Sequence, residues 1–574
     1  MNAAARPRDI ILFCDGTNNT LTGGKNDTNV LKLYQHMRAT RNPDQILYYD
    51  PGVGSPDGLP GVGLDVLSRK WERISGLASG HGVYENIREG YAFLMAHWQP
   101  GDRIWLFGFS RGAFTARAIS GMVNLFGLIE ARHVSILDTL MRVYFSPPPP
   151  KEGERIKGMR RWRKALGLKP DRPDRVTRNA VAEQIQTEFT SDAGACATVH
   201  FVGVWDTVES VGFPLLGSVT ITSTTSTNGK RISHVRHALS LDEHRMTFMP
   251  RLYEQVNTGY FPVARKEDGT EGSVRQIWFK GVHSDVGGGY ATCEAGLSNI
   301  TLAWMVDEAI PCGLRCEPCV AQADVLAHDM TYAVPWWALA GLCVRDVPEL
   351  TRKIREPQVE HSSVAGVGAH GASIWQERRS RLPVGVATLG AALAVAWQAW
   401  LLGSLSRVCE LAVAQLQFLW VLLVPSMPGL AARLGDARIG SAIAVDLLLI
   451  ACYAYVLARA FAWAFHRLAG PNHVDQRAPW WQLLGVAPLV CVLADLFENA
   501  LTLWVMGWSA PEFSFPQQLV LTVLGLASAS KFVAGGLSIL FVAAALVWGP
   551  RRSRVRHRSA VDAAAFATTV KSPR

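Results

Sequence analysis

A serine lies between two glycines in the pentapeptide Gly108-Phe109-Ser110-Arg111-Gly112. An apolar run over residues 104–107 precedes it, and small and apolar residues at helical spacing follow it. Strand, tight turn and helix is the setting in which Gly-x-Ser-x-Gly forms a nucleophile elbow, a strained turn that projects the serine hydroxyl above a sheet. The pattern therefore predicts Ser110 as a nucleophile, and a plain glycine-rich turn between strand and helix is the alternative.

A serine hydroxyl is a weak nucleophile near neutral pH and needs a base to take its proton. Asp206 follows an apolar strand pattern at 198–205, and His283 follows another at 274–280. Side chains at the carboxyl ends of parallel strands gather at one edge of the sheet. We therefore predict His283 as the base and Asp206 as the acid that orients it, in the chain order of α/β-hydrolases. Asp285 is the rival acid, and its other role would be to brace the glycine turn that follows.

The same chemistry needs hydrogen-bond donors for the oxyanion of the intermediate. The backbone N–H of Arg111, directly after the nucleophile, is one predicted donor. The loop of Asp15, Gly16 and Thr17, which follows an apolar run at 10–14, is predicted to supply the other.

Strand and helix patterns alternate along the first 350 residues, with short links. This alternation predicts an α/β-hydrolase-like, mainly parallel sheet with helices on both faces. A basic segment bounded by prolines, at about 147–180, is interpreted as an insertion that forms a lid or a membrane-contact flap, or else a flexible linker. Residues 237–250 are predicted to form a charged helical piece of undefined role.

The last third of the chain is hydrophobic. After a linker at 351–381, four apolar runs are each long enough to cross a bilayer, which takes about 20 residues. They lie at 382–403, 439–465, 483–508 and 519–548. We expect an all-α transmembrane domain over 382–550, an interfacial or re-entrant helix at 408–424, and a basic tail at 551–574.

Lys and Arg flank these runs on one side, which places the hydrolase domain and the C-terminus in the cytoplasm, at a bacterial inner membrane. Asp446, Asp495 and Glu498 lie within the runs, where carboxylates are costly. Interhelical packing is the favoured role for them, and ion coupling is the alternative.

The formal net charge of the 574-residue chain is +9, and it is concentrated at 151–178 and 551–558. Basic clusters beside apolar spans indicate contact with anionic lipid rather than with nucleic acid. The ten cysteines show no paired rhythm, which indicates free thiols, including the close triplet Cys312, Cys316 and Cys319. We expect no metal, no cofactor and no cleavable signal peptide, and the sequence does not indicate an oligomeric state.

Five motifs together resemble one known family. They are the segments at 13–17, 49–54, 108–112, 203–208 and 281–290, in that order. Over residues 8 to 330 the chain is similar to the catalytic domain of the bacterial type VI secretion phospholipase effectors, the family with the GFSRG elbow. The resemblance implies an α/β-hydrolase fold, a triad of Ser110, Asp206 and His283, and hydrolysis of phospholipid esters of the A1 or A2 type. The hydrophobic C-terminal third departs from the secreted members of that family.

The sequence thus predicts a membrane-anchored serine hydrolase that cleaves lipid carboxylic esters, with membrane lipids as both substrate and environment. An esterase for soluble acyl esters is one alternative. A membrane channel or signalling protein whose hydrolase-like domain only binds a ligand is the other.

Overall fold

The structure is a computed structural model, and it divides the chain into two compact units. One comprises residues 1–386 and 474–489, and the other comprises 387–473 and 490–574. The residues that the structure describes are 7–16, 26–40, 42–52, 81–146, 178–208, 232–245, 248–253, 273–320, 327–328, 330, 342, 345, 359–360, 382–402, 404, 415, 417, 438–469, 487–505 and 514–548.

The first unit is built on a parallel sheet of seven strands, in the order β2-β1-β3-β4-β5-β6-β7. The strands are β1 Asp9–Cys14, β2 Gln45–Asp50, β3 Arg103–Phe109, β4 Val199–Trp205, β5 Ile232–Ser240, β6 Ser273–Phe279 and β7 Val359–Glu360. Strands β1, β4 and β5 are buried along their whole length. The sequences of β1 and β4 are accordingly rich in β-branched and aromatic residues on both faces. Their carboxyl ends all lie at the same edge of the sheet.

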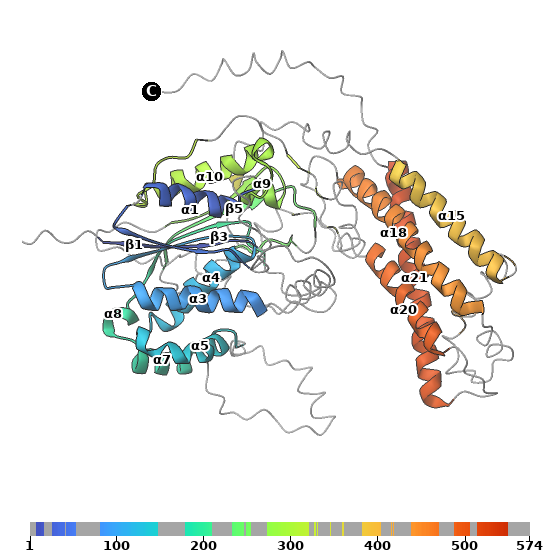
Figure 1. The fold of residues 1–574 in the computed structure, drawn as a ribbon, viewed down its shortest axis with the longest axis horizontal. Helices are drawn as coiled ribbons and strands as arrows, with labels where there is room; N and C mark the ends of the chain where they lie inside the picture. The colour runs from blue at the N-terminus through green and yellow to red at the C-terminus, as the bar shows by residue number, and fades with distance from the viewer. Residues whose placement is uncertain are drawn as a thin grey trace, which may run out of the picture. The chain divides into compact units, whose positions relative to one another are not determined.

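Helices cover both faces of this sheet (Figure 1). On one face lie α1 Asn29–Thr40 and α10 Gly296–Ala309, and on the other lie α3 His81–His97 and α4 Arg111–Phe126. Each face has its own apolar core, one formed with α3 and α4 and the other with α1 and α10. The other elements among the described residues of this unit are η1 Ala131–Ile136, α5 Leu137–Tyr144, α7 Arg178–Phe189, α8 Asp192–Ala195, α9 His283–Gly287 and η4 Thr292–Glu294.

The predicted fold class is confirmed: a parallel α/β sheet with helices on both faces precedes a helical region with apolar candidate spans. The predicted helical piece at 237–250 is wrong. His237 to Ser240 are the end of β5, which pairs with β4 and β6 and is buried between them. A fully buried strand is usually a run of apolar residues. This strand contains charged and polar residues, so its sequence does not predict a buried strand.

Several predicted segments lie outside the described residues. These are Thr17, most of the basic insertion at about 147–180, the tail at 551–574, and the interfacial helix at 408–424 apart from residues 415 and 417. Within the predicted linker at 351–381, Val359 and Glu360 form β7 at the edge of the sheet.

The second unit contains α15 Leu382–Leu402, α18 Arg438–Ala469, α20 Ala487–Val505 and α21 Phe515–Trp548. Among the described residues of this unit, three stretches are long and apolar enough to cross a membrane: Gly440–Phe465, Ala487–Val505 and Phe515–Val547. The first predicted span, at 382–403, coincides with α15. The apolar part of that helix, Val386–Leu402, is shorter than the three stretches above. Many large apolar side chains of these helices are exposed, Trp400 and Leu540 among them, as a lipid-facing surface requires.

The carboxylates inside this unit bind polar side chains of neighbouring helices. Asp446 of α18 accepts hydrogen bonds from Gln398 of α15 (2.8 Å) and from Asn499 of α20 (2.6 Å). Asp495 of α20 accepts a hydrogen bond from Tyr453 of α18 at 2.6 Å.

Lys531 of α21 forms the charged centre of the same cluster. It lies 3.0 Å from Asp495 and forms an ion pair with Glu498, which is fully buried. Removing one partner of a buried ion pair leaves an uncompensated charge and costs about 3–5 kcal/mol. The ammonium therefore stabilises the packing of α20 against α21.

We predict that Lys531→Met lowers the thermal stability of the detergent-solubilised protein strongly, because it leaves two buried carboxylates without their cation. Adding Asp495→Asn and Glu498→Gln to that variant should restore much of the loss, since the buried charges are then gone. Thermal unfolding of the single and triple variants measures this. Equal destabilisation of both variants would contradict the role of the ion pair.

Candidate active site

Ser110 occupies the turn between β3 and α4 in a strained conformation. Its φ is 57° and its ψ is −121°, a region that residues with a side chain seldom adopt. Among the described residues, the non-glycine residues with positive φ are Ser110 and Asp206. The backbone N–H of Ser110 donates to the carbonyl of Trp205 at 3.1 Å, which places the elbow beside the turn that carries Asp206.

Close backbone contacts hold the elbow in place. A Cβ atom at Gly112 would collide with the carbonyl oxygens of Cys14 and Asp15, so the first turn of α4 lies directly against the end of β1. A Cβ atom at Gly287 would collide with the ring of Phe109. The second contact brings α9, which begins at His283, next to the residue that precedes Ser110.

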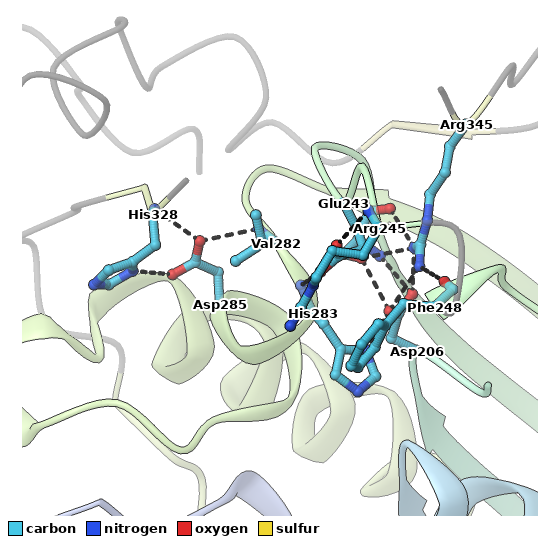
Figure 2. Close-up of polar contacts among 10 residues, drawn as sticks. Asp206, Glu243, Arg245, Phe248, Val282, His283, Asp285, His328 and Arg345 are labelled. Carbon is cyan, nitrogen blue, oxygen red and sulfur yellow. Dashed lines mark hydrogen bonds and ion pairs between the residues drawn. The ribbon is translucent and has the colours of Figure 1, made fainter. Parts of the chain in front are cut away.

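His283 and Asp206 are in direct contact (Figure 2). The Nδ1 atom of His283 lies 2.6 Å from Oδ2 of Asp206, and both side chains are buried. The imidazole also packs between two phenyl rings, with ring centroids 4.6 Å from Phe109 and 4.8 Å from Phe248. Its Nε2 atom is buried without a hydrogen-bond partner among the described residues. The ring is therefore held at Nδ1 and leaves Nε2 available.

Arg345 binds the other side of the Asp206 carboxylate. Its Nη1 and Nη2 atoms lie 2.6 Å and 3.1 Å from Oδ1 and Oδ2. Ser240, at the end of β5, donates to the same carboxylate from its backbone N–H and its hydroxyl, both at 3.0 Å. The carboxylate is thus fully hydrogen-bonded at a point where the residue has no exposed surface.

Glu243 holds the backbone of the histidine. Its Oε2 accepts a hydrogen bond from the N–H of His283 at 3.2 Å. The guanidinium of Arg245 pairs with both oxygens of this buried carboxylate, at 2.8 Å and 2.6 Å. Figure 2 shows these two carboxylates and two guanidinium groups gathered beside His283.

These charges set the pKa values of the site. Burial acts to raise the pKa of Asp206, but Arg345 and His283 outweigh it and hold that pKa well below its usual range. Burial likewise opposes ionisation of Glu243, and Arg245 reverses this, lowering the pKa to about 2. Burial lowers the pKa of His283, and the hydrogen bond to Asp206 offsets only part of that effect. The favoured state is an ionised Asp206 beside a neutral imidazole.

Asp285, the rival acid, is engaged elsewhere. Its carboxylate lies 2.6 Å from Nδ1 of His328 and accepts the backbone N–H groups of Val282 and His328, both at 3.0 Å. The imidazole of His328 stacks on Tyr290 at 3.7 Å between centroids. Asp285 thus fastens the start of α9, the helix that carries His283. His283 itself is the first residue of this short helix.

The predicted oxyanion loop is tightly bonded. The N–H of Asp15 donates to the carbonyl of Asp50 at 2.9 Å, and the N–H of Gly16 donates to Oδ1 of Asp15 at 2.6 Å. Thr28 and Tyr49 donate their hydroxyls to Oδ2 of Asp15. Arg111 opens α4, and the first N–H groups of a helix have no carbonyl partner within that helix. The N–H of Arg111 is therefore the better placed of the predicted donors.

Sequence reasoning missed Arg345, Glu243, Arg245, Ser240 and His328. None of them belongs to a motif with a recognisable spacing, and Arg345 lies 139 positions from Asp206. Only the general rule that a buried charge must be paired could have drawn attention to them, and burial is not visible in the sequence. Within the described residues, no group of three or more His, Cys, Asp and Glu side chains has an arrangement that could hold a metal ion.

A parallel sheet whose strand ends bring a serine elbow, a histidine and an ionised aspartate to one edge is the architecture of an α/β-hydrolase. The comparisons with known proteins point to a particular family. Residues 8–308, more than half of the chain, match the family described as T6SS, Phospholipase effector Tle1-like, catalytic domain. The chain belongs to this family, which confirms the resemblance seen in the sequence motifs.

One relative is the uncharacterized protein YEL023C of Saccharomyces cerevisiae. It is 27% identical over 427 residues, covering 54% of this chain and 58% of the yeast protein. The chain therefore spans less than two thirds of the length of that relative. No solved structure matches the chain.

The role of the contact between Arg345 and Asp206 can be tested by measuring how activity depends on pH. A base acts in its neutral form, so activity rises with pH through the pKa of His283. Arg345→Met removes a cation from the other side of Asp206, which should raise the pKa of His283 and move the acid limb of kcat/KM to higher pH, by about 1 unit. Arg345→Lys keeps the charge and should leave the limb near its original position. An unchanged limb in Arg345→Met, with only the rate reduced, would assign Arg345 a purely structural role.

Proposed function

We propose that this protein is a membrane-anchored serine hydrolase that cleaves carboxylic esters of phospholipids, by a phospholipase A-type activity. Membership of a phospholipase effector family supports lipid-ester hydrolysis. The observation that carries the finer proposal is the arrangement of His283. Its Nδ1 is fixed on an ionised carboxylate, and its buried Nε2 has no partner among the described residues. The ring packs on Phe109, the residue directly before the strained turn of Ser110.

The geometry supports a two-step mechanism. The Ser110 hydroxyl attacks the ester carbonyl while Nε2 of His283 takes its proton, and Asp206 stabilises the imidazolium that forms. The N–H of Arg111 donates to the oxyanion. The second donor stays a prediction for the loop of Asp15, Gly16 and Thr17, because the N–H groups of Asp15 and Gly16 are bonded to the Asp50 carbonyl and to the Asp15 carboxylate. His283 then returns its proton to the departing alcohol, and water releases the fatty acid from the serine ester by the reverse of these transfers.

The apolar helices of the second unit would hold the enzyme at its substrate. We propose an inner-membrane location with the catalytic domain and the C-terminus in the cytoplasm, supported by the Lys and Arg residues that flank the predicted spans. Protease protection in sealed membrane vesicles of known orientation tests this topology.

Ser110→Ala should abolish hydrolysis of phospholipid vesicles and labelling by a serine-reactive phosphonate, because it removes the attacking oxygen. Membrane insertion should be unchanged, which controls for folding. Lipid mass spectrometry of vesicles incubated with each protein identifies the acyl chain released. Normal lipid hydrolysis by Ser110→Ala would exclude the proposal, and turnover of short soluble esters in the absence of phospholipid turnover would favour the esterase alternative. Ion flux that does not depend on Ser110 would favour a channel.

The two candidate acids can be separated by conservative substitution. Asp206→Asn should lower kcat by about 10⁴, the effect expected when the base loses the carboxylate that fixes its tautomer. Asp285→Asn keeps the direct contact between His283 and Asp206, so its effect on kcat should be much smaller. Steady-state kinetics on one ester substrate, with circular dichroism to confirm folding, decides between them. A larger loss in Asp285→Asn would make Asp285 the acid.

A further inference from the structure

The side chain of Arg111 stands apart from the other arginines of the site. Arg345 pairs with Asp206, and Arg245 pairs with Glu243. Arg117, on the same helix as Arg111, donates to the carbonyl oxygens of Arg251 and Leu252 and lies 3.9 Å from the ring centroid of Tyr253. Each of these three guanidinium groups therefore has ion-pair or hydrogen-bond partners within the protein.

Arg111 has no such partner. Among the described residues, no ion pair, hydrogen bond or ring contact reaches its side chain, although the residue is partly buried. Burial lowers the pKa of Arg111 to about 10, and no carboxylate of the described residues opposes that effect. A partly buried guanidinium without a counter-charge is available to bind an anion through charged hydrogen bonds.

The carboxylates that follow the two strands next to β3 do not supply this anion. The carboxylate of Asp15 is occupied by Gly16, Thr28 and Tyr49. The carboxylate of Asp206 is occupied on its two sides by Arg345 and His283.

The position of Arg111 indicates which anion it serves. It directly follows Ser110 at the N-terminus of α4, where the unpaired N–H groups and the helix dipole also favour negative charge. In a glycerophospholipid, the phosphate lies only a few bonds from the ester carbonyl that Ser110 would attack. The planar guanidinium binds phosphate oxygens through two parallel hydrogen bonds, which a point charge cannot do.

We propose that the Arg111 side chain binds the phosphate of the phospholipid substrate and thereby selects phospholipids over uncharged lipid esters. This inference rests on the proposed function and makes Arg111 a specificity-determining residue of that site. Its backbone N–H and its side chain would then act on two different oxygens of one substrate.

The test compares two substrates with the same acyl chains, phosphatidylglycerol and diacylglycerol, in mixed micelles of a non-ionic detergent. Arg111→Gln keeps the backbone N–H and removes the cation. The ratio of kcat/KM for phosphatidylglycerol to that for diacylglycerol should fall about 10- to 100-fold, the range expected for charged hydrogen bonds. Arg111→Lys should recover part of the ratio. Arg132→Gln, an exposed arginine paired with Glu130, is the matched control and should leave the ratio unchanged.

A ratio that stays within about twofold in Arg111→Gln would overturn the inference, as would a wild-type enzyme that prefers diacylglycerol. Inorganic phosphate distinguishes the sources of the anion. Inhibition of diacylglycerol hydrolysis by phosphate, lost in Arg111→Gln, means that the site also takes free phosphate. A lowered ratio without such inhibition means that phosphate binds only as part of a lipid, and both results support the site.

The proposed function can fail separately. If the wild-type protein hydrolyses neither lipid, the anion site is tested by modification of Arg111 with phenylglyoxal, followed by peptide mass spectrometry. Protection of Arg111 by inorganic phosphate would support the site, and modification at an unchanged rate would overturn it.

Discussion

The carboxylate of Asp206 is a negative charge at a point without exposed surface, and the arrangement of the site follows from the need to stabilise it. Arg345 supplies the opposite charge, Ser240 supplies two hydrogen bonds, and His283 takes the remaining position. Because the carboxylate is already neutralised from behind, the imidazole need not be protonated to bind it. The ion pair between Arg345 and Asp206 therefore stabilises the buried carboxylate and also leaves His283 able to accept a proton.

The sheet brings these groups together because all its strands are parallel. Ser110 follows β3, Asp206 follows β4, Ser240 ends β5 and His283 follows β6, and these strands are consecutive in the sheet. Four successive strand ends thus contribute one group each. The strain at Ser110 is maintained by close packing, since the backbone of α4 touches the end of β1 and α9 touches Phe109. A looser sheet edge would let this turn relax.

Much of the fold and part of the site could be predicted from the sequence, for physical reasons. The strands that end at Cys14, Phe109 and Trp205 are apolar runs with aspartate or serine directly after them, so the apolar pattern and the polar residue that follows it predict these strands. The end of β5, residues 237–240, falls in a segment for which the sequence predicts a helix, because a strand with Arg236 and His237 lacks the usual apolar pattern. The residues that bind Asp206 and His283 could not be predicted. Arg345 and Glu243 reach them through contacts across more than 30 positions, and such contacts leave no pattern in the sequence.

The site also depends on Arg345, a residue beyond the part of the chain that matches the family. The family match ends at residue 308, and the residues that brace the acid and the start of α9, Arg345 and His328, come after it. Arg315, also beyond the match, pairs with Asp9 at the opposite end of β1. A fragment cut at the family boundary would contain all three proposed reacting groups, yet it would bury an aspartate with no counter-ion. A fragment that keeps the counter-ion of Asp206 therefore extends past Arg345, and Arg315, His328 and Arg345 belong to the structural unit of the catalytic domain.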